Sequence, residues 1–203
     1  AAESATFDLA QTYIVDLDVD ATNVDALVSF GDMTLRSYGA AHQYTLTGAL
    51  TVADAAALTL QDVSCNAQAG ISVGNSLLGQ IGFGEVTVEL GAMLWSAAGQ
   101  VGQAAGSEGM VSVNGAESEW TCDGDLHLGV FGEGSLLVSG GAAATGNSTS
   151  LGSETGSVGT LDVADPGSSF EAAGSLSVGG TADAAGGVGF VSVNGSGRVS
   201  VDQ

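Results

Sequence analysis

Residues 84–163 read GEVTVELGAMLWSAAGQVGQAAGSEGMVSVNGAESEWTCDGDLHLGVFGEGSLLVSGGAAATGNSTSLGSETGSVGTLDV, and this stretch decides the fold. A glycine followed by a short run of alternating apolar and polar residues recurs in it every 25 residues. The glycines are Gly84, Gly109, Gly134 and Gly159, and the runs that follow them end at Val88, Val113, Val138 and Val163. A fixed period of about 20–50 residues is typical of solenoids, propellers and other repeat arrays.

Two further columns of residues keep the same period. Seven positions after each of those valines stands a bulky or β-branched residue: Trp95, Trp120, Thr145 and Phe170. Thirteen positions after each valine stands an apolar residue: Val101, Leu126, Leu151 and Leu176. We therefore expect successive turns of the chain to stack, so that the first of these columns forms an aromatic file interrupted by Thr145.

The composition favours strands joined by tight turns. The chain has 33 glycines and one proline, and 44% of its 203 residues are apolar. Valine, threonine and leucine at alternating positions suit strands, and glycine suits the corners between them. No long helical periodicity is present. The sequence predicts an all-β protein, a β-solenoid of about eight coils of roughly 25 residues each.

We expect one domain over residues 1–203, with irregular N-terminal coils over 1–68 and regular repeats over 69–203. The first part reads as two or three wider, more divergent coils, because terminal repeats of an array are usually atypical. The last repeat is stretched by five residues at 181–187, and the pattern then resumes. Residues 190–195, FVSVNG, match residues 110–115, MVSVNG, almost residue for residue.

The net charge of −21 limits the range of partners. The chain has 23 acidic residues, no lysine and two arginines, Arg36 and Arg198. Nucleic acids and anionic membranes are excluded, because both require clustered Lys and Arg. No apolar run is long enough to predict membrane insertion. Self-repulsion of such a chain is relieved by salt or divalent cations, so saline surroundings or weakly bound calcium are both compatible with it.

The two cysteines are expected to be free of each other. Counted from the repeats, Cys65 shares a column with the tryptophans, and Cys122 lies two positions past that column and two coils further on. Two coils separate strands by roughly 10 Å, whereas a disulfide requires Cα atoms within about 7 Å. We expect two semi-buried thiols, with a bridge between molecules as the alternative.

Residues 70–203 resemble the autotransporter/PEP-CTERM-associated repeat of large bacterial surface proteins. The matching phrases are GSEGMVSV at 106–113, AESEW at 116–120 and GDLHLG at 124–129, with GSSF at 167–170 in the tryptophan slot. Residues 5–47 are similar to the lead-in of such repeats. The resemblance implies a right-handed parallel β-helix that is secreted and surface-exposed. Unlike that family, this sequence leads us to expect no translocator barrel and no C-terminal sorting segment, so the resemblance does not give an export route. The first residues, Ala1-Ala2-Glu3, suit a mature end left by signal cleavage at small residues.

Few residues in the sequence indicate a catalytic or metal-binding site. Asp16, Asp18 and Asp20 have the spacing of a calcium loop, but Ala21 and Leu27 stand where an EF-hand requires glycine and glutamate. Strand alternation would instead place the three carboxylates on one solvated face. His42 and His127 lack nearby Cys or His partners for zinc. We therefore predict no catalytic, cofactor-binding or metal-binding residue, and keep a cation at the three aspartates as the alternative.

Other functional patterns are equally sparse. Asn147 and Asn194 each begin an acceptor triplet for glycosylation. Nothing marks a particular pair of carboxylates for glycoside hydrolysis. A β-helix lyase would use a basic residue beside calcium, and Arg36 and Arg198 are the only candidates, near opposite ends of the chain. An ice-binding face would need a flat array of threonines at fixed spacing, and the threonines here are scattered between columns.

The leading functional hypothesis is a non-enzymatic structural protein of the cell surface or extracellular matrix. Its first and last coils expose sheet edges, which are templates for pairing with another chain. A contact of this kind that does not close gives a filament or layer, so we expect a homopolymer. An adhesin or glycan-binding passenger fragment, with a glycan or cell-surface partner, is the alternative, and a β-helix carbohydrate-active enzyme is a third.

Overall fold

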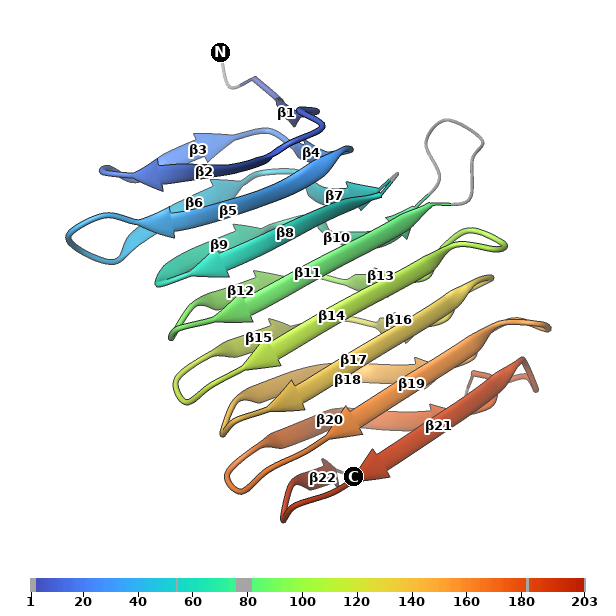
Figure 1. Ribbon diagram of the computed structural model, residues 1–203. Helices are drawn as coiled ribbons and strands as arrows, with labels where there is room; N and C mark the ends of the chain where they lie inside the picture. The colour runs from blue at the N-terminus through green and yellow to red at the C-terminus, as the bar shows by residue number, and fades with distance from the viewer. Residues whose placement is uncertain (1–2, 54, 76–81, 182, 203) are drawn as a thin grey trace.

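The protein is a β-solenoid, described here by a computed structural model (Figure 1). The structure describes residues 3–53, 55–75, 82–181 and 183–202, and within them the chain forms 22 strands and no helix. All strand pairs of the two sheets are parallel, as expected when each coil lies over the previous one. No helix in these residues is long and apolar enough to cross a membrane. Ala1, Ala2 and Ala182 lie outside the described residues.

One sheet, the front face, holds one strand from each of eight coils. Its strands are β2 (Thr12–Leu17), β5 (Gly31–Ser37), β8 (Ala56–Gln61), β11 (Phe83–Glu89), β14 (Glu108–Asn114), β17 (Glu133–Ser139), β19 (Val158–Val163) and β21 (Val188–Val193).

The other sheet, the back face, consists of two rows of short strands. The first row holds β3 (Ala21–Asn23), β6 (His42–Leu46), β9 (Val63–Ala67), β12 (Met93–Ser96), β15 (Glu119–Cys122) and β22 (Arg198–Val201). The second row holds β1 (Ala5–Phe7), β4 (Ala26–Val28), β7 (Ala49–Ala53), β10 (Gly70–Asn75), β13 (Gly99–Val101) and β16 (Leu126–Leu128). Two long strands join the rows: β18 (Ala143–Leu151) and β20 (Ser169–Val178).

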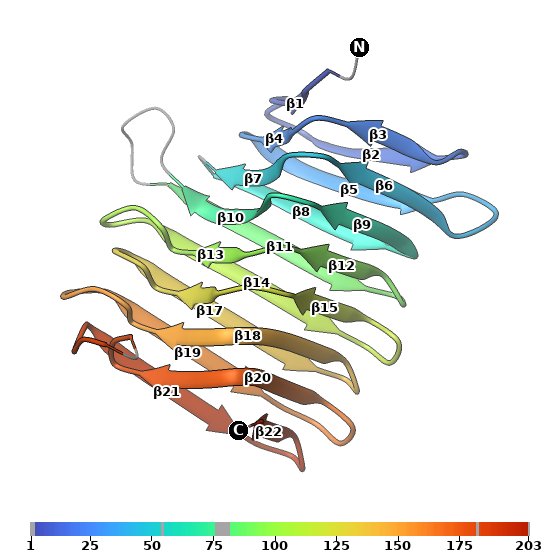
Figure 2. The same ribbon diagram turned by 180° about the vertical axis from the view of Figure 1, so that it is seen from behind.

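Each coil runs along the front face, turns, crosses both rows of the back face and returns. Seen from the N-terminal end, the chain circles clockwise as it recedes, so the coil is right-handed (Figure 1, Figure 2). The predicted fold class is therefore confirmed, with eight coils on the front face.

The register of the front face is the predicted one. Gly84 pairs with Gly109, which pairs with Gly134, and the column continues through Gly159 to Gly189. The valine column also runs unbroken, through Val88, Val113, Val138, Val163 and Val193. Glycine is required at Gly134 because a Cβ there would overlap the carbonyl oxygen of Val101, where the return turn meets the front face.

The register predicted for the back face is wrong in both columns. Trp95 pairs with Thr121, which pairs with Thr145, and this column faces outward. Trp120 instead shares an inward column whose members are Ala21, Tyr44, Cys65, Leu94, Ala144, Phe170 and Val199. The corner from the valine column is six positions long before Leu94 and seven before Trp120, so equal sequence spacing does not give equal position.

The second back-face column fails for the same reason. Val101 pairs with Leu128, Leu151 and then Val178, whereas Leu126 and Leu176 occupy the slot two residues earlier, together with Gly99 and Thr149. All of these slots still face inward, so the predicted residues enter the core without forming the predicted column. The aromatic file does not exist: Trp120 and Phe170 have Ala144 between them.

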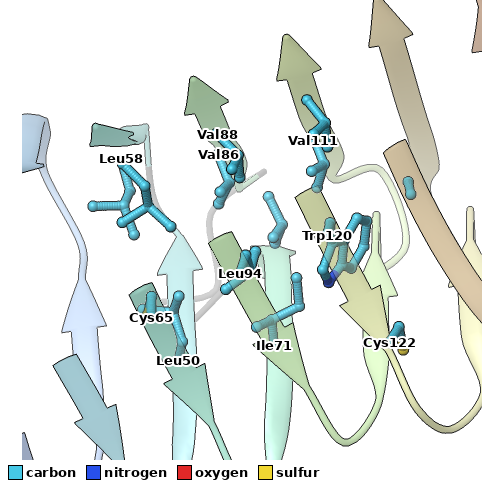
Figure 3. Close-up of a cluster of buried hydrophobic side chains, with 14 of the residues drawn as sticks. Leu50, Leu58, Cys65, Ile71, Val86, Val88, Leu94, Val111, Trp120 and Cys122 are labelled. Carbon is cyan, nitrogen blue, oxygen red and sulfur yellow. The ribbon is translucent and has the colours of Figure 1, made fainter. Parts of the chain in front are cut away.

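The core fills the space between the two faces. Side chains alternate between inward and outward along each front-face strand, and the inward ones are almost fully buried in the middle coils. Figure 3 shows Leu58, Val86, Val88 and Val111 of the front face opposite Cys65, Leu94 and Trp120 of the back face. Trp120 is fully buried, and its Nε1 donates a hydrogen bond of 3.1 Å to Ser96 Oγ.

The N-terminal coils differ from the prediction in width. The first coil is narrower than expected, since Thr12 pairs with Asp32 only 20 residues later. The second spans 25 residues, from Gly31 to Ala56, and the third spans 28, from Gln61 to Glu89. The last coil is stretched by five residues as predicted, with Gly159 paired to Gly189.

Candidate functional site

The last coil exposes side chains at positions where the preceding coils bury theirs in the core. Val191 lies in the column of Val111 and Leu161, and Val193 in the column of Val113 and Val163. The four middle residues are 0% exposed, whereas Val191 is 40% and Val193 is 48% exposed. On the back face Val178 and Val201 are also exposed. The last coil thus presents an apolar surface formed by inward-facing side chains without a coil above them.

The outermost strands also carry unpaired backbone edges. At the C-terminal end, β21 pairs with β19 and β22 with β20, and neither has a second partner strand among the described residues. At the N-terminal end, β1, β2 and β3 each pair only with the strand of the following coil. Free N–H and C=O groups at a sheet edge favour pairing with another strand. The two ends together are the candidate assembly site, the first and last coils at which the repeat predicts exposed sheet edges.

The three aspartates do not form one strand face. β2 ends at Leu17, so Asp16 lies on the strand and Asp18 and Asp20 lie in the corner after it. Asp16 accepts hydrogen bonds from the guanidinium of Arg36, which lowers the pKa of this carboxyl below its usual range. The N–H of Gln43 donates to Asp20 Oδ1 at 2.9 Å and lowers the pKa of Asp20. Within the described ranges, no group of three or more His, Cys, Asp or Glu residues is arranged to hold a metal ion.

The two arginines differ in their surroundings. Arg36 pairs with Asp16 of the preceding coil, in direct register. Arg198 begins β22 on the last coil and is exposed, and within the described part of the chain no ion pair is formed by it. The structure therefore does not bring the two predicted basic candidates together, because they lie near opposite ends of the rod.

The two histidines are also far apart. His42 lies on β6, with Nδ1 3.5 Å from Asp20 Oδ1. His127 lies on β16, and its Nδ1 is 2.6 Å from Ser150 Oγ, which in turn is 2.8 Å from Ser153 Oγ. Spacing by the 25-residue period did not reveal this cluster, because His127 and Ser150 are only 23 residues apart.

A shallow polar groove surrounds His127. It has a volume of about 220 Å³, and the outward column of His127, Ser150 and Ser177 forms its floor. Asp125 and Asp183 line its sides. Hydroxyl, imidazole and carboxylate groups can donate and accept hydrogen bonds to a small polar ligand there. The 25-residue repeat does not predict this groove, because the turn that carries Asp183 lies outside the regular repeat.

Cys65 and Cys122 are both free thiols in the structure, and both are buried rather than semi-buried as expected. Burial raises the pKa of the Cys65 thiol to about 12. Asn147 and Asn194 have exposed side chains, as glycosylation acceptors must.

Comparison with known proteins gives no relative from which a function can be transferred. No family model, no curated protein and no solved structure matches the chain.

Proposed function

We propose that this chain is a non-enzymatic structural protein of the bacterial cell surface or extracellular matrix, and that its copies stack head to tail into a filament or layer. The observation that carries the proposal is the apolar surface of the last coil, where Val191 and Val193 are exposed in columns that are otherwise closed. A second copy that adds a coil there buries these side chains and pairs the free strand edges.

The charge of the chain supports this function. A net charge of −21 keeps separate copies soluble through mutual repulsion. Salt screens this repulsion over a Debye length of about 10 Å at 0.1 M, whereas apolar burial at the ends is strengthened rather than weakened by excluded salts. Assembly therefore responds to salt, and saline surroundings outside the cell favour the polymer.

The test is sedimentation velocity and electron microscopy of the purified protein over a range of salt concentrations. Wild-type protein is expected to form filaments or sheets as salt is raised. Val193→Asp places a charge on the apolar surface of the last coil and is expected to give monomers. Ser192→Asp adds the same charge on the outward side of the same strand and is expected to assemble. Wild-type protein that remains monomeric at every salt and calcium concentration contradicts the proposal.

A second candidate function is glycan binding, as in an adhesin passenger fragment. It is favoured by the polar groove at His127, whose hydroxyl and carboxylate groups suit sugar hydroxyls. Glycan-array binding by monomeric protein, lost in Ser150→Ala, supports this candidate. Binding that is unchanged by that substitution counts against the groove as the site.

A further inference from the structure

We infer that the junction between copies continues the internal register of the solenoid, so that Arg198 of one copy forms an ion pair with Asp20 of the next. The inference rests on the proposed head-to-tail assembly and specifies its contact surface and polarity. It follows from extending the paired columns of the two sheets by one strand at each end.

The front face fixes the first part of the register. The column of Val191 runs back through Leu161, Leu136, Val111, Val86, Leu58 and Met33 to Tyr13. The next strand in this column, at the start of a following copy, is therefore that of Tyr13. Val193 likewise meets Val15. Tyr13 and Val15 are partly buried apolar residues packed against the core of the first coil, so each exposed valine meets an apolar side chain.

The corners of the two terminal coils have the same length. Val193 of the front face and Val199 of the back face are six positions apart. Val15 and Ala21, which occupy the same two columns in the first coil, are also six positions apart. Internal corners vary, since the corner from Leu35 to Tyr44 takes nine positions. The two corners that meet at the junction are thus alike, although equal length is not required for register, since the corner from Leu60 to Cys65 takes five positions and still pairs at both ends with the corner from Leu35 to Tyr44.

The charged pair lies one position before that back-face column. Arg198 precedes Val199 on β22, and Asp20 precedes Ala21 at the start of β3. Register-paired residues on neighbouring strands are about 4.8 Å apart, within reach of an Arg–carboxylate bond. The protein already contains such a pair across coils, since Asp16 and Arg36 are register partners that form an ion pair.

The second row of the back face also stays in register across the junction, so the next copy continues the solenoid coil. On the second row of the back face, the C-terminal end of the solenoid presents Val178 at the end of β20, in the column that begins with Phe7 on β1. A following copy that places β1 beside β20 brings Phe7 against Val178, which is 53% exposed. Its β2 then lies beside β21 and its β3 beside β22. Three strand contacts and one ion pair therefore form together.

The test compares Arg198→Asp, Asp20→Arg and an equimolar mixture of the two. Each variant alone places like charges in the junction and is expected to raise the critical concentration for assembly at least about tenfold. The mixture is expected to restore wild-type assembly as an alternating copolymer. In that copolymer the two introduced side chains face each other at one junction, and the native Arg198 and Asp20 face each other at the next. The double variant in one chain is expected to assemble alone.

Controls separate the junction from folding and from net charge. Asp18→Arg makes the same charge change in the same corner. Residue 18 would lie opposite the uncharged Ser196 of the neighbouring copy, so this variant is expected to assemble as wild type does. Circular dichroism and melting temperature verify that each variant folds. If wild-type protein assembles and both single variants assemble equally well, or if the mixture restores nothing, the register is wrong while the proposed function stands. If wild-type protein does not assemble, the proposed function itself fails.

Discussion

Two segments of nearly identical sequence differ in how deeply their side chains are buried. Residues 110–115, MVSVNG, and residues 190–195, FVSVNG, place their strand residues in the same columns of the front face. The corner that follows is seven positions long before Trp120 and six before Val199. Val113 is 0% exposed and Val193 is 48% exposed. The sequence of a front-face strand therefore sets its register, whereas the burial of its side chains depends on the presence of a coil on either side.

The contrast between buried middle coils and an exposed last coil predicts that substitutions cost more stability in the middle coils. The largest loss is expected at the buried tryptophan, Trp120. Trp120→Ala removes a fully buried ring and the hydrogen bond to Ser96, and is expected to lower the free energy of unfolding by about 3–5 kcal/mol. Val199→Ala, in the same column on the last coil, is expected to cost less than about 1 kcal/mol. Urea unfolding of the monomer, measured at low salt, gives both values.

Trp95→Ala is the matched control for the tryptophan. Trp95 faces outward and donates a hydrogen bond from Nε1 to Asp123, so its loss is expected to cost less than about 1 kcal/mol. Equal losses at Trp95 and Trp120 contradict the register described for the back face.

A smaller effect is expected at the valines of the two segments. Val113→Ala leaves a cavity between three coils and is expected to cost about 2 kcal/mol. Val193→Ala removes the same groups from a half-exposed site and is expected to change monomer stability by less than about 0.5 kcal/mol. The same urea experiment serves for both variants. A Val193→Ala loss that matches Val113→Ala indicates that the last coil is already covered in the monomer.

The smallest effect on stability at neutral pH is expected from two buried ionisable side chains of the core, Cys65 and Tyr44. Burial raises the pKa of the Cys65 thiol to about 12 and that of Tyr44 to about 12, above their ordinary values of 9.0 and 10.0. Because the folded state favours the protonated forms, stability is fully present below about pH 9 and falls as pH rises toward 12. Urea unfolding from pH 7 to 11 measures the fall.

Substitution identifies the source of that pH dependence. Cys65→Ala is expected to flatten the curve above pH 9, and Tyr44→Phe to flatten it further above pH 10. Val193→Cys, an added thiol on the last coil, is expected to react with a thiol reagent at pH 8, while Cys65 and Cys122 remain protected. A Cys65 that reacts as fast as the added thiol contradicts its burial.

Much of the front face was predictable from the sequence. The glycine column at Gly84, Gly109, Gly134 and Gly159 and the valine column ending at Val163 are where the period places them, because every front-face strand begins a repeat. The stretch of the last coil was also predictable, since the resumption of FVSVNG after residue 189 fixes its length.

The back face was not predictable from the period. The corner before Trp120 is one position longer than the corner before Leu94, and other turns compensate, so the 25-residue spacing survives while the register changes. The narrow first coil and the cluster at His127 and Ser150 follow from variation in the return turn, which takes five positions from Val28 to Met33 but ten from Val101 to Val111. The aspartates were assigned to one strand because alternation continues in the sequence past Leu17, where the strand itself ends.

The most direct test of the account is a helical reconstruction of the assembled protein by electron cryomicroscopy. Eight front-face strands per copy at about 4.8 Å each predict a rise of about 38 Å per subunit, with strand spacing unbroken across each junction and Arg198 beside Asp20 of the next copy. A twofold axis between copies, or a gap wider than one strand spacing at the last coil, would contradict it.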